Sequence, residues 1–277
     1  MNAPCRFRFH GTGGALFGQM FVGFLLMILT LGIYTPWFIC KLTKWAHENT
    51  ELVDDDGNWV RLTFRGSGGQ LFGIYFVGML LSFITLGIYS FWFIADLYRF
   101  FIENTTGETV DGEQVELKFA GTGGELFGKV FVGFLLTFVT CGIYSPWMVC
   151  SILEYIYNNT SILVDQQEML TIQFVGTGGE LFGIYIVGVI LTFLTCGIYQ
   201  FWFQVNLLKF TMGNTLITMK DDEEEVYRVH FTGTGGELFG IHLLGLILIP
   251  LTFGIYYFWF IVNLIRFQTE HLEIDFD

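Results

Sequence analysis

The sequence predicts a polytopic α-helical membrane protein with small β-hairpins outside the membrane. Three observations lead to this fold class. Hydrophobic residues make up 53% of the 277 residues and charged residues only 14%, whereas a soluble domain carries roughly 25% charged residues. A Gly-Thr/Ser-Gly-Gly phrase begins five times, at Gly11, Gly66, Gly121, Gly176 and Gly233. An apolar run that carries almost no charge follows each copy.

The composition also excludes several functions. A net charge of −13 argues against nucleic-acid binding, which needs a basic face. The five cysteines show no CxxC or Cys/His ligand spacing, so neither a metal site nor a cofactor is expected. The five histidines fall at unmatched repeat positions, and the sequence contains no HExxH, nucleophile-elbow or P-loop motif. We therefore expect a protein that is not an enzyme.

The five glycine phrases are separated by 55, 55, 55 and 57 residues. Such a fixed period is the signature of a repeat architecture. We expect one membrane domain over residues 1–277, built from repeats of the ββαα type. The repeats are expected at residues 5–59, 60–114, 115–169, 170–226 and 227–277.

Each repeat begins with an alternating stretch, as in Val60, Leu62 and Phe64, which are separated by Arg61 and Thr63. A period of two predicts a strand with one buried face. A turn-rich segment and a second β-prone segment precede each internal strand, so every linker is predicted to be a β-hairpin. Two of these turns, at residues 54–56 and 221–225, are strongly acidic.

A hydroxyl residue stands before each apolar run, with Glu or Gln three positions later in four of the repeats. This is the capping-box pattern of a helix N-terminus. The alternative, a phosphate-binding glycine loop, would need a βαβ unit and an acidic ribose ligand, whereas an apolar helix follows here. The predicted helix caps are Ser67, Thr122, Thr177 and Thr234.

The apolar run at residues 71–89 contains 19 uncharged residues, which as a helix would extend about 28 Å, close to the thickness of a bilayer core. A Gly-Ile-Tyr break follows, then a tryptophan and a second, more amphipathic helix. Tyrosine and tryptophan beside a glycine break are typical of the membrane interface. The predicted interface anchors are Trp37, Trp92, Trp147, Trp202 and Trp259.

Charged residues are nearly confined to the ends that carry the strands, and the five Gly-Ile-Tyr turns have none. If each repeat is a hairpin of two membrane segments, all linkers lie on one side, which the positive-inside rule makes cytoplasmic. The sequence therefore predicts a multi-pass protein with cytoplasmic linkers and termini.

The repeated Gly-Thr/Ser-Gly-Gly-x-Leu-Phe-Gly and Gly-Ile-Tyr-x-Pro/Phe-Trp motifs resemble the YjgN-like family of bacterial inner-membrane proteins over essentially the whole chain. The resemblance implies an inner-membrane location and supplies no activity or catalytic residues. Members of that family place basic residues four and seven positions after the tryptophan. The first of these positions is mostly lost here, being Lys41, Asp96, Ser151, Asn206 and Asn263.

The second position largely keeps its ionisable character. Ionisable residues at membrane depth are costly and are often functional. The alternative is that they extend toward the headgroups from a short helix, with Asp96 and Arg99 paired locally. The candidate functional column is Lys44, Arg99, Glu154, Lys209 and Arg266. A stripe of small residues on the preceding helix, such as Gly78, Ser82 and Thr85, is interpreted as a helix-packing face in preference to a polar pore lining.

The two ends of the sequence each supply half of a hairpin. Residues 5–9 form only a second strand, and residues 272–276 form only a first strand. Pairing them would remove two exposed strand edges. We therefore expect the repeats to curve into a pseudo-fivefold ring.

Two functions follow from this architecture. The first is a passive pore or small-solute pathway, which a continuous axial cavity would favour. The second is a membrane scaffold whose acidic hairpin face docks a cytoplasmic protein partner. The lipid bilayer is the one partner that the composition itself requires, and the sequence does not indicate an oligomeric state.

Overall fold

The structure is a computed structural model and describes residues 5–53, 57, 59–220 and 226–276. Within these residues, the chain alternates one or two strands with pairs of helices. The elements are β1 (Cys5–Phe9), α1 (Gly13–Leu29), α2 (Thr35–Glu48), β2 (Thr50–Val53), β3 (Trp59–Phe64), α3 (Gly68–Ile84), α4 (Ser90–Glu103), β4 (Thr105–Thr109), β5 (Gln114–Phe119), α5 (Gly123–Val139), α6 (Ser145–Asn158), β6 (Thr160–Val164), β7 (Gln167–Phe174), α7 (Gly178–Leu194), α8 (Gln200–Gly213), β8 (Thr215–Met219), β9 (Val226–Phe231), α9 (Gly235–Leu251), α10 (Tyr257–Glu270) and β10 (Leu272–Phe276).

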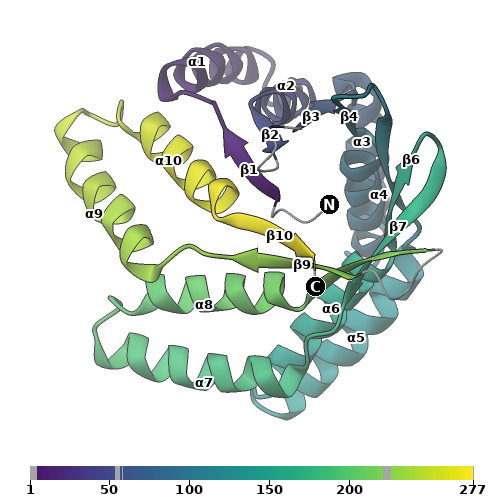
Figure 1. Cartoon of the computed structure of the whole chain (residues 1–277), viewed down its shortest axis with the longest axis vertical. Coiled ribbons are helices and arrows are strands. Elements are labelled where there is room, and N and C mark those ends of the chain that lie inside the picture. Colours follow the sequence, from purple (N-terminus) through teal and green to yellow (C-terminus); the bar gives the residue numbers. More distant parts are fainter. Residues whose placement is uncertain (1–4, 54–56, 58, 221–225, 277) are drawn as a thin grey trace.

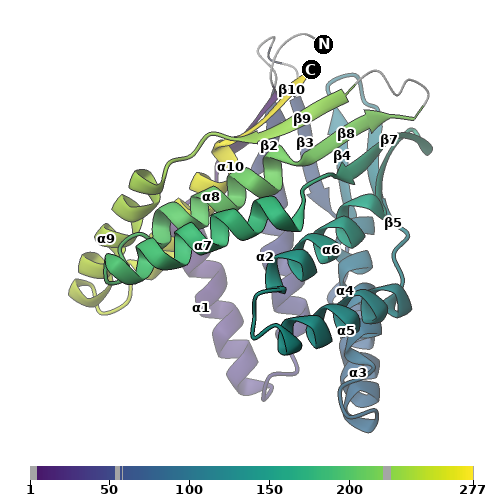
Figure 2. The same cartoon turned by 90° about the horizontal axis from the view of Figure 1, so that it is seen from below.

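The ten strands of the described residues form one closed antiparallel barrel, in which each strand pairs with its neighbours in sequence. The barrel closes where β1 pairs with β10, with Cys5 opposite Ile274 and Arg6 opposite Glu273. The pairing expected between the terminal strands is therefore present. The terminal strands β1 and β10 lie side by side at the barrel, away from the bends of the helical hairpins (Figure 2).

The fold class expected from the sequence is wrong. The structure is a closed barrel of ten strands with ten helices over the described residues, where a polytopic helical membrane protein with peripheral hairpins was predicted. None of the helices in the described ranges combines the length and the apolarity needed to traverse a bilayer.

The helix expected over residues 71–89 ends earlier than predicted. Helix α3 ends at Ile84, with Thr85 as its C-cap, and Leu86 and Gly87 follow with φ angles of 51° and 91°. A positive φ is incompatible with a continuing right-handed helix. The Gly-Ile-Tyr break thus begins inside the apolar run, and the long run becomes a helix and a tight bend.

The same bend recurs in all five hairpins. The Thr30 hydroxyl donates to the Leu26 carbonyl at 2.7 Å and accepts from the Tyr34 amide at 3.0 Å, so one side chain joins the end of α1 to the start of α2. The equivalent bends are made by Thr85, Thr140, Thr195 and Thr252.

The last phenylalanine of each strand that precedes a hairpin is buried and packs edge-to-face on an aromatic ring of the even-numbered helix. The Phe64 and Phe100 ring centroids, for example, are 5.9 Å apart. Such aromatic pairs add roughly 0.5–1.5 kcal/mol beyond the area that they bury. The other pairs are Phe9–Trp45, Phe119–Tyr155, Phe174–Phe210 and Phe231–Phe267.

The hydrophobic core of the described residues is divided into five clusters, each of which lies between neighbouring repeats. One cluster joins Cys40 of the first repeat to Phe64, Leu71 and Phe100 of the second. Another joins Val262 of the last repeat to Phe9, Leu16 and Trp45 of the first. None of these clusters connects opposite sides of the ring.

The helical hairpins sweep around the barrel in one sense (Figure 1). The accessible surface is 15534 Å², compared with about 12,000 Å² for a compact monomer of the same mass. The molecule therefore exposes more surface than a compact monomer, and its core packing runs around the ring from repeat to repeat.

Candidate functional site

The predicted caps begin the odd-numbered helices. The Ser67 hydroxyl accepts from the Gln70 amide, and the Gln70 side chain accepts from the Ser67 amide, so that both halves of the capping box are formed. Complete boxes also start α7 and α9, at Thr177 and Thr234. These residues position the helices, since each cap satisfies amides that would otherwise lack partners.

Two caps differ from the predicted box. Thr122 accepts from the Glu125 amide at 3.2 Å, but the Glu125 carboxylate accepts from the Asn159 side chain at 3.5 Å. Thr12 caps α1 through the Ala15 amide at 3.3 Å, although its repeat has no Glu or Gln at that position. The hydroxyl is thus the constant part of the cap.

The predicted tryptophan anchors lie at the bend of each hairpin and contact the next repeat. A β-carbon on Gly68 would come within 2.6 Å of the Trp37 α-carbon. The five contacts are Trp37–Gly68, Trp92–Gly123, Trp147–Gly178, Trp202–Gly235 and Trp259–Gly13. These tryptophans therefore join consecutive repeats, and Trp259 joins the last repeat to the first; their placement at a membrane interface stays a prediction.

The candidate ionisable column does not converge on one site, because its members belong to five different hairpins. Two of its arginines connect adjacent repeats. The Arg99 guanidinium donates to the Gly121 carbonyl at 2.7 Å, to the Phe119 carbonyl at 3.4 Å and to Asp96 at 2.9 Å. Arg266 donates to the Gly11 carbonyl at 3.4 Å. Both arginines hold the glycine segment of the following repeat.

The remaining members of the column have local contacts or none. Lys44 lies 3.8 Å from Glu48 one turn along α2. The Glu154 carboxylate pairs with the Lys129 ammonium at 3.0 Å, across the α5–α6 hairpin. Lys209 has no hydrogen bond or ion pair within the described ranges.

The small-residue stripe packs against the returning helix of its own hairpin. A β-carbon on Gly78 would clash with the Phe93 ring, and the equivalent glycines Gly23, Gly133, Gly188 and Gly245 are covered in the same way. This agrees with the helix-packing interpretation. The Ser82, Thr137 and Thr192 hydroxyls on this stripe are buried and have no hydrogen-bond partner among the described residues.

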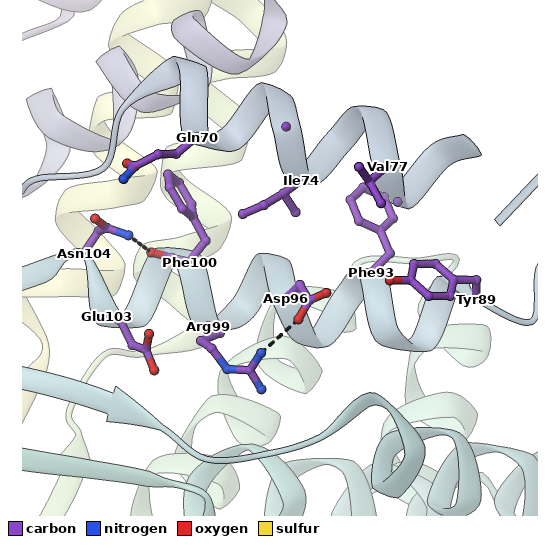
Figure 3. Close-up of a pocket in the computed structure, with 12 residues that line it drawn as sticks. Gln70, Ile74, Val77, Tyr89, Phe93, Asp96, Arg99, Phe100, Glu103 and Asn104 are labelled. Carbon is purple, nitrogen blue, oxygen red and sulfur yellow. Dashed lines mark hydrogen bonds and ion pairs between the residues drawn. The ribbon is translucent and has the colours of Figure 1, made fainter. Parts of the chain in front are cut away.

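A groove of about 600 Å³ lies between α3 and α4. Its lining includes Ile74 and Val77 of α3 and Asp96, Arg99 and Glu103 of α4, and Figure 3 shows Arg99 and Glu103 projecting from the side of α4 away from α3. The groove ends near Gln70 and Asn104 on one side and near Tyr89 on the other. Its walls thus combine an apolar strip with two carboxylates and one guanidinium.

Sequence reasoning missed this groove. The local pairing of Asp96 with Arg99 was expected as the alternative to a functional role and is present at 2.9 Å, whereas Glu103 was not singled out. The available signal was the combination of two acidic residues and one basic residue on the single face of one amphipathic helix. The acidic turns at residues 54–56 and 221–225, where a protein partner was expected to dock, lie outside the described residues.

The described part of the chain contains neither a candidate metal site nor a disulfide. No group of three or more His, Cys, Asp or Glu side chains is arranged to hold a metal ion there. No disulfide joins cysteines of the described residues, and Cys141 and Cys196 are exposed at the bends of adjacent hairpins.

A family described as "Bacterial protein of unknown function (DUF898)" matches four successive stretches, at residues 4–60, 59–116, 114–168 and 169–221. The chain belongs to this DUF898 family. The repeated matches agree with the internal repeats, and the resemblance to YjgN-like proteins is confirmed.

Two similar proteins share the same curated name. The "Inner membrane protein YjgN" of Escherichia coli (strain K12) is 39% identical over 73 residues, which are 26% of this chain and 17% of that protein. Its namesake in Salmonella typhimurium (strain LT2) is 35% identical over 91 residues, 33% of this chain and 21% of that protein. The chain thus matches about a fifth of the length of these relatives. No solved structure matches it.

Proposed function

We propose that this DUF898 protein is a non-enzymatic inner-membrane protein whose hairpins contact lipid and whose ring forms a passive passage for small solutes. The names of the relatives support the membrane location. The single observation that supports the passage is the division of the core into five clusters, each between neighbouring repeats and none across the ring.

The exposed surface of the odd-numbered helices supports lipid contact. Phe76, Met79 and Phe83 on α3 are 60%, 58% and 82% exposed, and the other odd-numbered helices expose similar side chains. Contiguous apolar patches larger than a few hundred Å² are rare on soluble monomers. Exposing this apolar surface to water costs free energy, and contact with lipid chains removes that cost.

The barrel is proposed to face the cytoplasm, with both termini on that side. Arginines and lysines recur on the strands, as at Arg6, Arg8 and Lys118, whereas the hairpin bends carry no charge. Basic residues are retained on the cytoplasmic side of bacterial membranes. The hairpins would enter the lipid from this side and return to it.

Solute flux tests the passage. The full chain is reconstituted into liposomes loaded with urea, glycerol or sucrose, and release is followed by light scattering. A passage predicts release above that of empty vesicles, with a size limit between the smallest and the largest solute. Equal rates with and without protein, for all three solutes, would refute the passage and leave the scaffold that docks a cytoplasmic partner as the remaining proposal.

A further inference from the structure

The odd-numbered helices become more exposed toward the hairpin bends. On α3, Phe72, Phe76 and Phe83 are 37%, 60% and 82% exposed, and Leu86 in the bend is 94% exposed. The same rise occurs on α5, where the exposed fraction reaches 77% at Phe138. The exposed apolar surface is therefore concentrated in the half of each hairpin that lies nearest its bend.

Charged side chains mark where this apolar half ends. On the even-numbered helices, the charged residue nearest the bend stands six or nine positions after the first helical residue, which is about 9 to 14 Å along a helix. On α5, Lys129 stands ten positions before the last residue, about 15 Å along the helix. Half of a bilayer's hydrocarbon core is also about 15 Å thick. The charged residues nearest the bends of the even-numbered helices, called the boundary residues below, are Lys41, Asp96, Glu154, Lys209 and Arg266.

The boundary residues include two accessible carboxylates. The side chains of Asp96 and Glu154 are 45% and 52% exposed. A charged group at the centre of a bilayer is costly, and these short side chains cannot extend to the headgroups as lysine and arginine do. The two carboxylates therefore fit the level of the headgroups, with only the apolar half of each hairpin below them.

The tryptophan contacts between hairpins limit how far the hairpins extend along the ring axis. Trp37 is the third residue of α2, next to the bend, yet it packs on Gly68, the first residue of α3 in the following hairpin. Helix α3 has 17 residues, which extend about 25 Å. Hairpins parallel to the ring axis would displace each following hairpin along that axis by most of a helix length. Because the ring closes through Trp259 and Gly13, the hairpins must instead be inclined to the axis and wind around it (Figure 1).

We propose that the five hairpins insert together into one leaflet of the bilayer, with their bends deepest and the boundary residues at the headgroups. The partner of this surface is the acyl chains of that leaflet, which in the orientation proposed above is the cytoplasmic one. The inference rests on the lipid contact of the proposed function and specifies its depth. A ring that also conducts solutes would have to thin the bilayer over it, as short apolar elements do.

Thiol accessibility in vesicles tests the depth. One variant keeps Cys141, which is exposed at the α5–α6 bend, and replaces the other cysteines by alanine. The matched variant has no native cysteine and carries Glu108→Cys on the exposed surface of β4. Each full chain is inserted into preformed vesicles of choline-headgroup and glycerol-headgroup lipid. A membrane-impermeant maleimide is then added outside or trapped inside, and circular dichroism checks that both variants are folded.

Single-leaflet insertion predicts that Glu108→Cys reacts with the maleimide from one side only. Cys141 should react at least tenfold more slowly from both sides, and it should react fully after denaturation. Reaction of Cys141 from the side opposite to that of Glu108→Cys would show that the hairpins cross the bilayer, which would overturn the inference and leave lipid contact intact. Reaction of both thiols from the same side would refute lipid contact itself.

Quenching by brominated lipids tests the placement of the boundary residues. A dye on Cys141 should be quenched about twofold more by bromine near the ends of the acyl chains than by bromine near the headgroups. A dye at Lys209→Cys, a boundary residue that is exposed on α8, should show the reverse order. The same order at both positions would overturn the proposed depth.

Discussion

Trp37 lies so close to Gly68 that a β-carbon on the glycine would come within 2.6 Å of the tryptophan α-carbon. The neighbouring atom belongs to the backbone and cannot rotate away. The start of α2, just after the bend of one hairpin, therefore packs directly on Gly68, the first residue of helix α3 in the next hairpin. A β-carbon on Gly13 would meet the Trp259 ring in the same way, so a tryptophan–glycine contact also closes the ring.

Gly68→Ala should destabilise the protein, because the added methyl group forces α2 and α3 apart. Overpacking of this kind costs about 1–3 kcal/mol. Thermal unfolding in detergent, followed by circular dichroism, should show a lower midpoint. Gly69→Ala is the matched control: its β-carbon meets nothing within 4 Å, and alanine favours a helix over glycine by about 1 kcal/mol. An equal response of the two variants would contradict this account of the contact.

Closure of the barrel predicts an intramolecular disulfide. In a variant that keeps Cys5 but replaces the other cysteines by alanine, Ile274→Cys places a thiol directly opposite Cys5. The α-carbons of such partners are about 4.5–5.5 Å apart, within the range of disulfides. Mild oxidation should therefore cross-link the termini, which a mass shift and faster migration in denaturing gels would detect.

The adjacent variant Glu273→Cys is the control for this cross-link. Its side chain projects from the opposite face of the strand, since successive side chains alternate, so it should form the bond far more slowly. Equal cross-linking at residues 273 and 274 would show that the terminal strands are not held in this register.

Arg99→Met should weaken the junction between the second and third repeats. The substitution removes hydrogen bonds to the Gly121 and Phe119 carbonyls and leaves Asp96 without its cation. Hydrogen bonds to charged groups contribute about 1.5–3 kcal/mol when well formed, and partial exposure reduces this to about 1–2 kcal/mol. The unfolding midpoint in detergent measures the effect.

Lys209→Met is the control that tests whether any substitution at this position of the repeat lowers stability. Lys209 stands at the same repeat position but has no hydrogen bond or ion pair among the described residues, so its removal should leave stability nearly unchanged. If both variants lowered the midpoint equally, the carbonyl contacts of Arg99 would not be the cause.

The strands, helix caps and repeats could be predicted from the sequence because each depends on a local pattern. Alternation at Val60, Leu62 and Phe64 indicates a strand whatever surrounds it, and Ser67 with Gln70 satisfies helix amides within one turn. The pairing of β1 with β10 could also be predicted, since each terminus supplied half of a repeated hairpin.

The fold class could not be predicted, because it depends on where one apolar run stops being helical. Leu86 adopts a φ of 51°, which leucine disfavours, so its identity gives no signal of a bend. The groove was missed for a related reason. The pairing of Arg99 with Asp96 could be predicted from their spacing of three residues. The contacts of Arg99 with two carbonyls of the next repeat could not, because no spacing in the sequence reveals them.

The ion pair between Glu168 and Lys220 predicts a measurable titration. The hydrogen bond from Lys220, 2.6 Å long, and a further one from Ser161 lower the pKa of the Glu168 carboxyl below its usual 4.5. Because the folded-state pKa is depressed, the pair contributes stability above pH 4.5 and loses it as the pH falls through the folded-state pKa. Lys220→Met should raise the pKa of Glu168, as measured by carboxyl-carbon NMR; an unshifted titration would contradict the pairing.

The hairpin bends should enter lipid before any other part of the protein. Leu31, Leu86 and Phe253 are 94%, 94% and 98% exposed, and each is held at a φ of 51°, a conformation that costs a non-glycine residue about 1–2 kcal/mol. In a cysteine-free background, Leu86→Cys labelled with an environment-sensitive dye should shift its emission to shorter wavelength when vesicles are added. A dye at Gln114→Cys on β5 should not respond, and a shift at both sites or at neither would contradict insertion through the bends.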